Sequence, residues 1–264
     1  MSVLRIYVEG IGLWSPQLAN FTALRDVLAG ATPELPAARP AATTLPANER
    51  RRAPESVLLA VEAAGQAVTM SNRDAATLAC VFASAHGDQA ITDYMCATLA
   101  RAPTELSPIR FHNSVHNAAV GYWTIATGCH APSTSICAQA ASFGAALLEA
   151  ASQVVAEQHP VLLVCSDIAG CGPLGDVIGS TQPFGSALVL APQAGASARA
   201  RLDLVVTAGS TVDPLVEPLA GWRGATPSAA VLPGLALLAG KKNGRCQLAA
   251  AEALGLQVDV EHGT

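Results

Sequence analysis

Two histidines spaced four residues apart, His112 and His116, have the residue type and spacing of metal ligands on one face of a helix. A catalytic zinc site of this kind needs a third ligand and a glutamate between the histidines. Neither is present nearby, and Asn113 and Asn117 are better suited to starting a helix than to binding a metal. We therefore expect structural or interface histidines, and we predict no metal site.

Two further motifs could carry chemistry. His86 beside Asp88 has the composition of an acid–base pair, but no nucleophile motif accompanies it, so we favour a turn after a strand. The run Gly170-Cys-Gly-Pro-Leu-Gly175 matches the dinucleotide fingerprint G-x-G-x-x-G, which needs a helix opening at the glycines. Because Pro173 and Gly179 argue against a helix, we predict a loop there and no cofactor.

Composition excludes other classes of function. The net charge of −5 and an isoelectric point near 5.6 disfavour a nucleic-acid partner. No apolar run approaches the ~18 residues that span a bilayer, and Arg5 and Glu9 interrupt any secretion signal. Charged residues make up only 13%, which points to an extensive protein contact. The arginine run 50–52 is interpreted as a solvated patch, with phosphate contact as the alternative.

The seven cysteines include no C-x-x-C pair. Cys80, Cys137 and Cys165 lie in apolar, strand-like runs. This pattern is typical of buried, reduced thiols, and we expect a cytoplasmic protein.

The elements that would position these residues alternate between strands and helices. Apolar runs and alternation predict strands at 4–8, 78–83, 132–139, 161–165, 188–190 and 202–206. Helical periodicity predicts helices at 22–28, 57–68, 89–100, 117–127 and 142–157. The first strand should end in a turn at residues 10–12, and residues 31–54 should cross the surface irregularly. The order indicates an α/β protein with a mostly parallel sheet covered on both faces.

Three segments of this pattern carry a family resemblance. Phe111-His-Asn-Ser-Val-His-Asn-Ala-Ala-Val-Gly-Tyr-Trp-Thr-Ile-Ala-Thr-Gly128 resembles the helix that precedes the nucleophile strand of β-ketoacyl-ACP synthases, the condensing enzymes. Pro132-Ser133-x-Ser135-Ile136 resembles the start of that strand, and Val8-Glu-Gly-Ile-Gly-Leu-Trp-Ser-Pro16 resembles their first strand and turn. The resemblance covers roughly residues 3 to 208. It implies the N-terminal half of a thiolase-type fold, a mostly parallel five-stranded sheet between helices.

The chain departs from that family at the nucleophile. Counted without gaps from Pro132, the catalytic cysteine of a ketosynthase falls on Ala140. A shift of one residue gives Gln139, as in chain-length factors, which have glutamine in place of the cysteine. Neither side chain can carry an acyl thioester, and Cys137, three positions earlier, would point to the opposite face of the strand. The resemblance therefore implies no catalytic residue.

Length is the second departure. The family's second half repeats the first and supplies two histidines for decarboxylation. Residues 209–264 are too few for that half, and His262 is the one histidine among them. We expect a ketosynthase-like half at 1–208 and a short tail at 209–264 that packs on it, with the apolar run 229–239 covering part of the exposed helical face.

The resemblance implies a non-catalytic partner of a complete ketosynthase, similar to a chain-length factor. The pathway would be type II fatty acid or polyketide biosynthesis of the aryl-polyene kind, with acyl carrier protein an indirect partner. Two alternatives stay open, an acyl-thioester hydrolase or transferase using Cys137 or His86, and a structural homodimer. In the family the nucleophile strand pairs with its mate across the two-fold interface. The residues expected to line the acyl pocket or interface are His112, Asn113, His116, Trp123, Ser133, Ser135, Cys137, Gln139 and Phe143.

Overall fold

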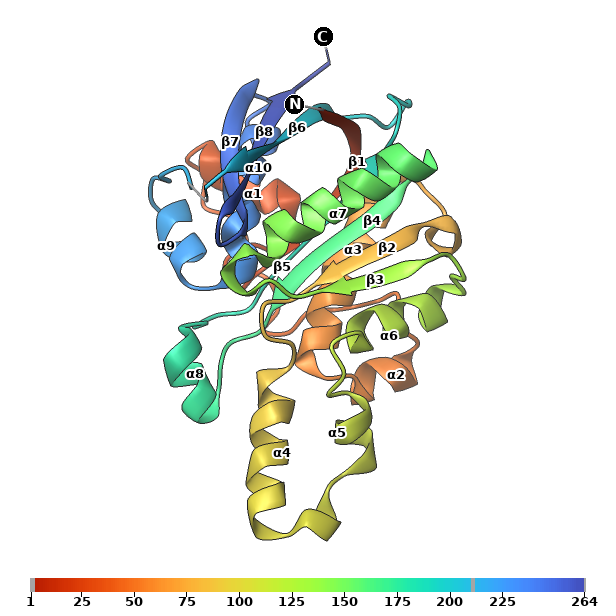
Figure 1. Cartoon of the computed structure of the whole chain (residues 1–264), viewed down its shortest axis with the longest axis vertical. Coiled ribbons are helices and arrows are strands. Elements are labelled where there is room, and N and C mark those ends of the chain that lie inside the picture. Colours follow the sequence, from red (N-terminus) through yellow and green to blue (C-terminus); the bar gives the residue numbers. More distant parts are fainter. Residues whose placement is uncertain (1–2, 210–211, 264) are drawn as a thin grey trace.

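The computed structural model describes residues 3–209 and 212–263, which form a sheet with helices on both of its faces (Figure 1). The strands are β1 (Leu4–Trp14), β2 (Ala79–Ala83), β3 (Ser133–Ile136), β4 (Val161–Asp167), β5 (Phe184–Ala191), β6 (Ala200–Ala208), β7 (Gly244–Ala251) and β8 (Leu254–Glu261). The α-helices are α1 (Phe21–Leu28), α2 (Ala47–Arg52), α3 (Glu55–Ser71), α4 (Gln89–Arg101), α5 (Pro108–His112), α6 (Ala118–Thr127), α7 (Ser142–Glu157), α8 (Gly172–Ile178), α9 (Leu219–Gly224) and α10 (Leu232–Ala239). Short 3₁₀ helices include η3 (Gln139–Ala141) and η4 (Pro227–Val231).

The sheet is mixed. Its strands lie in the order β3-β2-β4-β5-β1-β6-β8-β7. Strand β2 pairs in parallel with β3 and with β4, whereas the other five adjacent pairs are antiparallel. The α/β thiolase-like class is confirmed, but the sheet has eight strands and is not mostly parallel. The error has a physical reason. Strands β4 and β5 are buried on both faces, and such burial is typical of parallel sheets, but helices on both faces of this sheet bury its antiparallel strands as well.

Strand β1 continues through the glycines that we expected to form a turn. A Cβ atom on Gly10 would lie 2.0 Å from the carbonyl oxygen of Ala67, and one on Gly12 would lie 1.8 Å from that of Ala63. The glycines therefore allow helix α3 to pack directly on the strand, which is the reason for their presence.

The C-terminal segment becomes part of the sheet. Strand β8 pairs antiparallel with β6 from Arg201–Glu261 to Ala208–Leu254, and β7 pairs with β8. Sequence reasoning missed both strands, although Leu254, Leu256, Val258 and Val260 alternate with smaller or polar residues. The tail does not merely pack on the first 208 residues, because it extends their sheet.

Helix α7 lies inside the curl of this sheet. It contacts β2 and β4 near one end of the strand order and β7 at the other end (Figure 1). One core cluster joins α7 with the inner faces of β1, β4, β7, β8 and α10, and a second lies on the opposite face under α3 and α6. The tail therefore covers one side of α7.

Three local predictions need correction. The strand expected at 132–139 is only Ser133–Ile136, because the chain turns out of the sheet at Cys137. The segment expected to be a loop forms helix α8, since Pro173 occupies the first turn, where proline favours a helix start. Residues 47–52, part of the segment expected to cross the surface irregularly, form helix α2. The helix predicted at 117–127 is confirmed as α6, which ends at Gly128 with φ +65°.

Helices α4 and α5 form a lobe that projects away from the sheet (Figure 1). Helix α4 contacts α5 and α8. In the described ranges, none of the helices is long and apolar enough to cross a membrane.

Candidate functional site

Several candidate residues lie close together at the carboxyl ends of the three parallel strands. Ser84 and Ala85 follow β2, Cys137 to Gln139 follow β3, and Asp167 is the last residue of β4. Ligands and catalytic groups in α/β proteins gather at the carboxyl ends of such strands.

Gln139 occupies the sharpest point of the turn between β3 and α7. Its φ is +50°, a left-handed conformation that costs energy for any residue with a Cβ. The Ser142 hydroxyl holds the turn, since it donates to the Gln139 carbonyl at 2.7 Å and accepts from the Ala138 N–H at 2.9 Å. Ala140, the position reached by counting without gaps, lies one residue later inside η3. Both side chains are exposed, and neither has a nucleophilic atom.

Cys137 lies two residues before that turn. Its thiol is exposed, in contrast to our expectation of a buried one, because the chain has left the strand at this point. The Sγ atom donates to the carbonyl oxygen of Ala85 at 3.0 Å. Among the described residues, no histidine or lysine forms a hydrogen bond with this thiol, so the arrangement lacks the base that activates a cysteine nucleophile.

Ser84 and Ala85 connect the three strand ends. The carboxylate of Asp167 accepts from the Ser84 hydroxyl and from the Ala85 N–H, both at 2.8 Å. His116 Nε2 lies 3.1 Å from the Ser84 carbonyl oxygen. Sequence reasoning missed Asp167, whose one available signal was its position directly after a buried strand.

The suggested pair of His86 and Asp88 is not formed. One oxygen of Asp88 accepts from the Ile91 N–H at 2.9 Å and thereby caps helix α4. Its other oxygen accepts from the Ser56 hydroxyl at 2.6 Å. With both oxygens committed to structure, Asp88 is not placed to orient His86 as a base.

The remaining candidates are dispersed. Trp123 is fully buried under α3, and Phe143 is buried on the opposite face of the sheet, so the structure places them in two different core clusters. Asn113 is buried and accepts from the Tyr122 hydroxyl at 3.3 Å. His112 is exposed and lines an apolar cavity of about 510 Å³ beside α6, together with Val115. No grouping of three metal-binding side chains occurs within 3–209 and 212–263.

Buried thiols are protonated elsewhere in the fold. Burial raises the pKa of Cys80 and that of Cys246 to about 12. Burial also holds the pKa of Cys165 well above the usual range for a thiol. Each of these side chains is therefore a packing residue.

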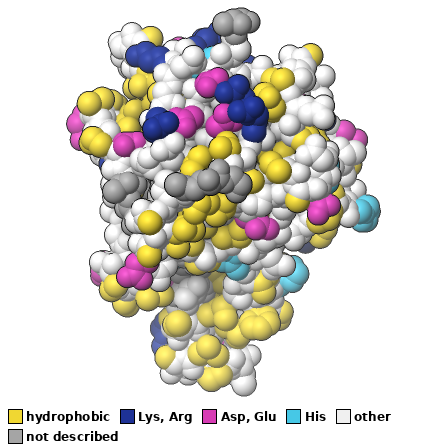
Figure 2. All heavy atoms as spheres, turned by 45° about the horizontal axis from the view of Figure 1, so that its top comes forward, with side chains coloured by type: hydrophobic (Ala, Val, Ile, Leu, Met, Phe, Trp, Pro, Cys, Tyr) yellow, Lys and Arg dark blue, Asp and Glu magenta, His cyan; other side chains and the backbone are white. Residues whose placement is uncertain are grey.

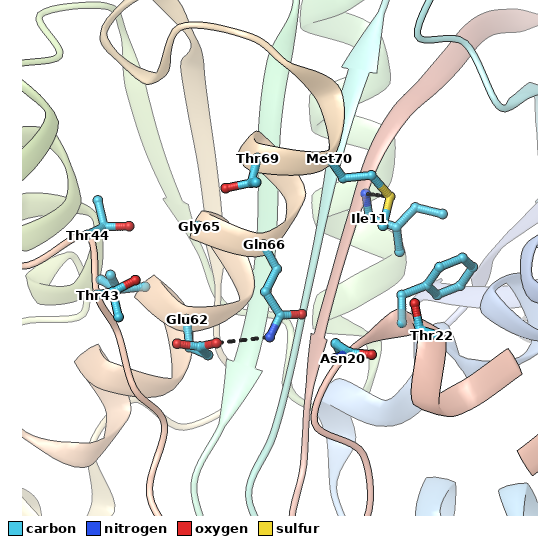
Figure 3. Close-up of a pocket in the computed structure, with 12 residues that line it drawn as sticks. Ile11, Asn20, Thr22, Thr43, Thr44, Glu62, Gly65, Gln66, Thr69 and Met70 are labelled. Carbon is cyan, nitrogen blue, oxygen red and sulfur yellow. Dashed lines mark hydrogen bonds between the residues drawn. The ribbon is translucent and has the colours of Figure 1, made fainter. Parts of the chain in front are cut away.

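A second cavity, of about 470 Å³, lies between α1, α3 and the loop at Thr43 (Figure 3). Two side chains of α3 accept from N–H groups of β1 beyond Val8, where β1 is no longer paired with β6. Gln66 Oε1 accepts from the Leu13 N–H at 3.1 Å, and Met70 Sδ accepts from the Ile11 N–H at 3.3 Å. Gln66 and Met70, which line this cavity, thus hold the helix on the strand.

Comparisons with known proteins agree with this architecture. Residues 29–215 match the family model described as beta-ketoacyl synthase, N-terminal domain. A ketosynthase (ApeO) in complex with its chain length factor (ApeC) from Xenorhabdus doucetiae matches with a TM-score of 0.73 and 23% identity, covering 96% of this chain and 98% of the matched chain. No curated protein matches.

Two further solved complexes match over similar lengths. One is AntDE:AntF, a type II polyketide synthase acyl-carrier protein with its ketosynthase bound to the hexaketide (TM-score 0.74, 13% identity, 97% of this chain and 99% of that chain). The other is the ishigamide ketosynthase/chain length factor (TM-score 0.74, 12% identity, 98% and 99%). At these identities the likeness establishes the fold. Because the family model covers well over half of its residues, the chain belongs to the family of β-ketoacyl synthase N-terminal domains.

Proposed function

We propose that this chain is a non-catalytic subunit that pairs with a complete β-ketoacyl synthase, as a chain-length factor does, in type II fatty acid or polyketide biosynthesis of the aryl-polyene kind. The observation that carries the proposal is an asymmetry between the two edges of the sheet. Strands β3 and β7 are the two edges, and a carboxylate of the chain occupies an outward N–H of β7, whereas among the described residues no such contact is made with the outward groups of β3.

The β3 edge presents backbone groups for pairing. The carbonyls of Pro132 and Ile136 accept from β2, at 2.9 Å from Cys80 N and 3.3 Å from Ser84 N. In a parallel strand, successive residues direct their backbone N–H and C=O groups alternately toward one neighbouring strand and toward the other side. Ser133 and Ser135 therefore direct theirs away from β2, where the sheet has no further strand. An edge strand in this state is a template for strand addition from another chain.

The opposite edge is protected at one point by a side chain. The carboxylate of Asp213 accepts the Gln247 N–H at 2.7 Å, and helix α7 packs against the far end of β7. Proteins commonly protect an edge in this way when it must not associate. The contrast indicates that association is directed to β3.

Apolar side chains are exposed on the lobe and on α6. The exposed ones on α4, α5, α6 and the loop between α5 and α6 are Leu99, Ile109, Phe111, Val115 and Ile125. Figure 2 shows apolar atoms gathered on the lobe at the bottom of the view. A surface of this kind is typical of an obligate protein contact.

The chemistry of the site supports a non-catalytic role. The turn that would hold a nucleophile presents Gln139, and an amide cannot form an acyl thioester. The tail histidine does not supply the base, since His262 lies at the end of β8 between the carbonyls of Arg199 and Leu237, at 3.2 and 3.3 Å. The solved complexes that share this fold include ketosynthases with chain length factors, which supports a pairing role here as well.

Intact-mass spectrometry after incubation with acyl-ACP tests this function. The chain alone should gain no acyl mass, and in a mixture with a complete ketosynthase the acyl group should appear on the ketosynthase. A stable acyl adduct on this chain, mapped to Cys137, would instead favour the hydrolase or transferase alternative.

A further inference from the structure

The largest cavity beside the tail lies at the opposite end of the sheet from β3. It has a volume of about 690 Å³ and is bounded by α1, α10 and the segment 213–215. Its apolar wall includes Leu28, Leu215 and Leu237. A volume of this size is in the range of cavities that hold small organic ligands.

Positively charged side chains line this cavity. Arg25 at the end of α1 and Lys242 after α10 both line it, and neither forms an ion pair in the described ranges. Arg245 also lines it but is bound to Asp259 at 2.7 Å. The carboxylates present are Asp213, which accepts the Gln247 N–H, and Asp26. Two cations without an ion pair thus face two carboxylates, of which Asp213 is already engaged by a backbone N–H.

The turn that carries the lysines is strained. Lys241 ends helix α10 with φ +49°, in the position where glycine is usual, and its N–H donates to the Leu238 carbonyl. Lys241 and Lys242 are the only lysines in the sequence. A non-glycine residue in this conformation costs about 1 kcal/mol, and such costs concentrate at functional positions.

We propose that this cavity binds a single-chain amphiphile with an anionic head, such as a medium-chain carboxylate or alkyl phosphate. The head lies between Arg25 and Lys242, where a guanidinium forms charge-assisted hydrogen bonds with its oxygens. The chain lies on the wall formed by Leu28, Leu215 and Leu237 and is removed from water there. The site is separate from the β3 edge.

Isothermal titration calorimetry of the full chain with decanoate and decyl phosphate, each below its micellar concentration, tests the proposal. We expect saturable 1:1 binding that weakens with added salt. The double variant Arg25→Gln/Lys242→Gln should weaken it at least tenfold, while the matched variant Arg50→Gln/Arg51→Gln on α2 should leave it unchanged. Both pairs are surface residues, and circular dichroism checks their folding.

Three comparison ligands distinguish binding of the whole amphiphile from binding of the anionic head alone, of the apolar chain alone or of a membrane surface. Acetate should not bind measurably, because the head alone lacks the apolar contact, and decyltrimethylammonium should not bind, because its charge is wrong. Binding only to anionic vesicles, and not to the free amphiphiles, would overturn the proposal in favour of a membrane surface. Equal affinity of the Arg25/Lys242 variant, or no saturable binding at millimolar ligand, would also overturn it. None of these outcomes bears on pairing through β3.

Discussion

The α-carbon of Gly144, in the first turn of α7, faces the carbonyl of Ala249 on β7 so closely that a Cβ there would lie 2.1 Å from the oxygen. The contact joins the helix that follows the candidate site to the outermost strand of the tail. It therefore identifies where the C-terminal segment packs against α7.

Gly144→Ala should consequently destabilise the fold. Backbone atoms of β7 would have to move to admit the methyl group, and we expect a loss of about 1–3 kcal/mol in the free energy of unfolding. The matched control is Gly121→Ala on α6, where an added Cβ meets nothing within 4 Å. That variant should be neutral or more stable by about 0.5–1 kcal/mol, because alanine favours the helix. Urea unfolding measures both, and equal effects would contradict the tight contact at Gly144.

Removing the Asp213 carboxylate should open the second edge of the sheet. Asp213→Ala leaves the Gln247 N–H without its acceptor, and we expect association that increases with protein concentration. Asp213→Asn retains an acceptor oxygen and should remain like the wild type. Sedimentation velocity across a concentration series distinguishes the two variants. Identical behaviour of the alanine and asparagine forms would show that Asp213 does not protect this edge.

The strain at Gln139 should be measurable. Glycine adopts φ near +50° without steric cost, so Gln139→Gly should stabilise the chain by about 0.5–1 kcal/mol after its greater entropy in the unfolded state is counted. Ala140→Gly, one residue later in η3, should be destabilising because no left-handed conformation is relieved there. Thermal and urea unfolding report both changes. A destabilised Gln139→Gly variant would imply that the glutamine side chain is itself required for the turn.

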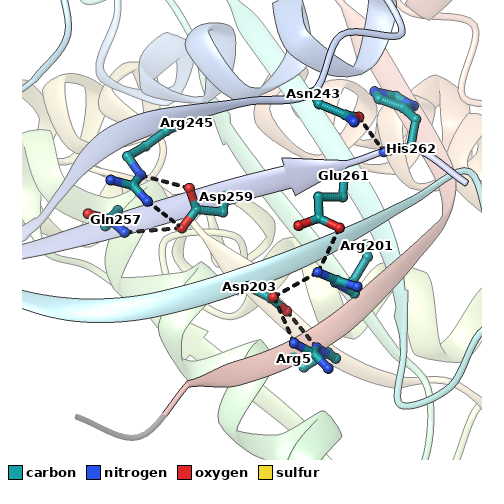
Figure 4. Close-up of polar contacts among 9 residues, drawn as sticks. All are labelled: Arg5, Arg201, Asp203, Asn243, Arg245, Gln257, Asp259, Glu261 and His262. Atoms are coloured by element: carbon teal, nitrogen blue, oxygen red, sulfur yellow. Dashed lines mark hydrogen bonds and ion pairs between the residues drawn. The ribbon is translucent and has the colours of Figure 1, made fainter.

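The charged face of β1, β6, β8 and β7 should contribute a pH dependence (Figure 4). The Arg5 guanidinium, which binds Asp203 at 2.8 Å, holds the pKa of that carboxyl below its usual range, with further help from Arg201. A lowered folded-state pKa means that the stabilisation is complete above pH ~4 and is lost as pH falls through the folded-state value.

Unfolding free energies of wild type and Asp203→Asn between pH 7 and 3 test this contribution. The difference should be about 1 kcal/mol or less, because Arg5 is half exposed. The asparagine variant should show the smaller loss of stability in acid. Asp203 also lies directly opposite Asp259 in the β6–β8 register, so the variant relieves one like-charge pair as well. Parallel pH curves for the two proteins would exclude Asp203 as a contributor.

Features of the fold and the candidate site that depend on neighbouring residues could be predicted from the sequence, whereas features that depend on residues far along the chain could not. Helix α6 was predictable because its periodicity and its glycine cap at Gly128 are local signals. The direction of β5 and the place of β7 were not, since strand pairing depends on partners far along the chain. Trp123 lies in a segment that carries the family resemblance, yet its burial in a different core from Phe143 is a property of the packed sheet. The strained φ of Gln139 likewise has no sequence signal, because glycine is absent there.

The mass of the complex formed with a complete ketosynthase tests the central claim most directly. Light scattering should give a 1:1 heterodimer with the wild-type chain at micromolar concentration. Ser133→Arg places a charge on the exposed side of the β3 edge and should abolish the complex, whereas the matched variant Gln193→Arg, on the loop after β5, should retain it. Ser135 is a poorer probe, since its hydroxyl oxygen is buried. A wild-type chain that remains monomeric both alone and with the ketosynthase would contradict the account.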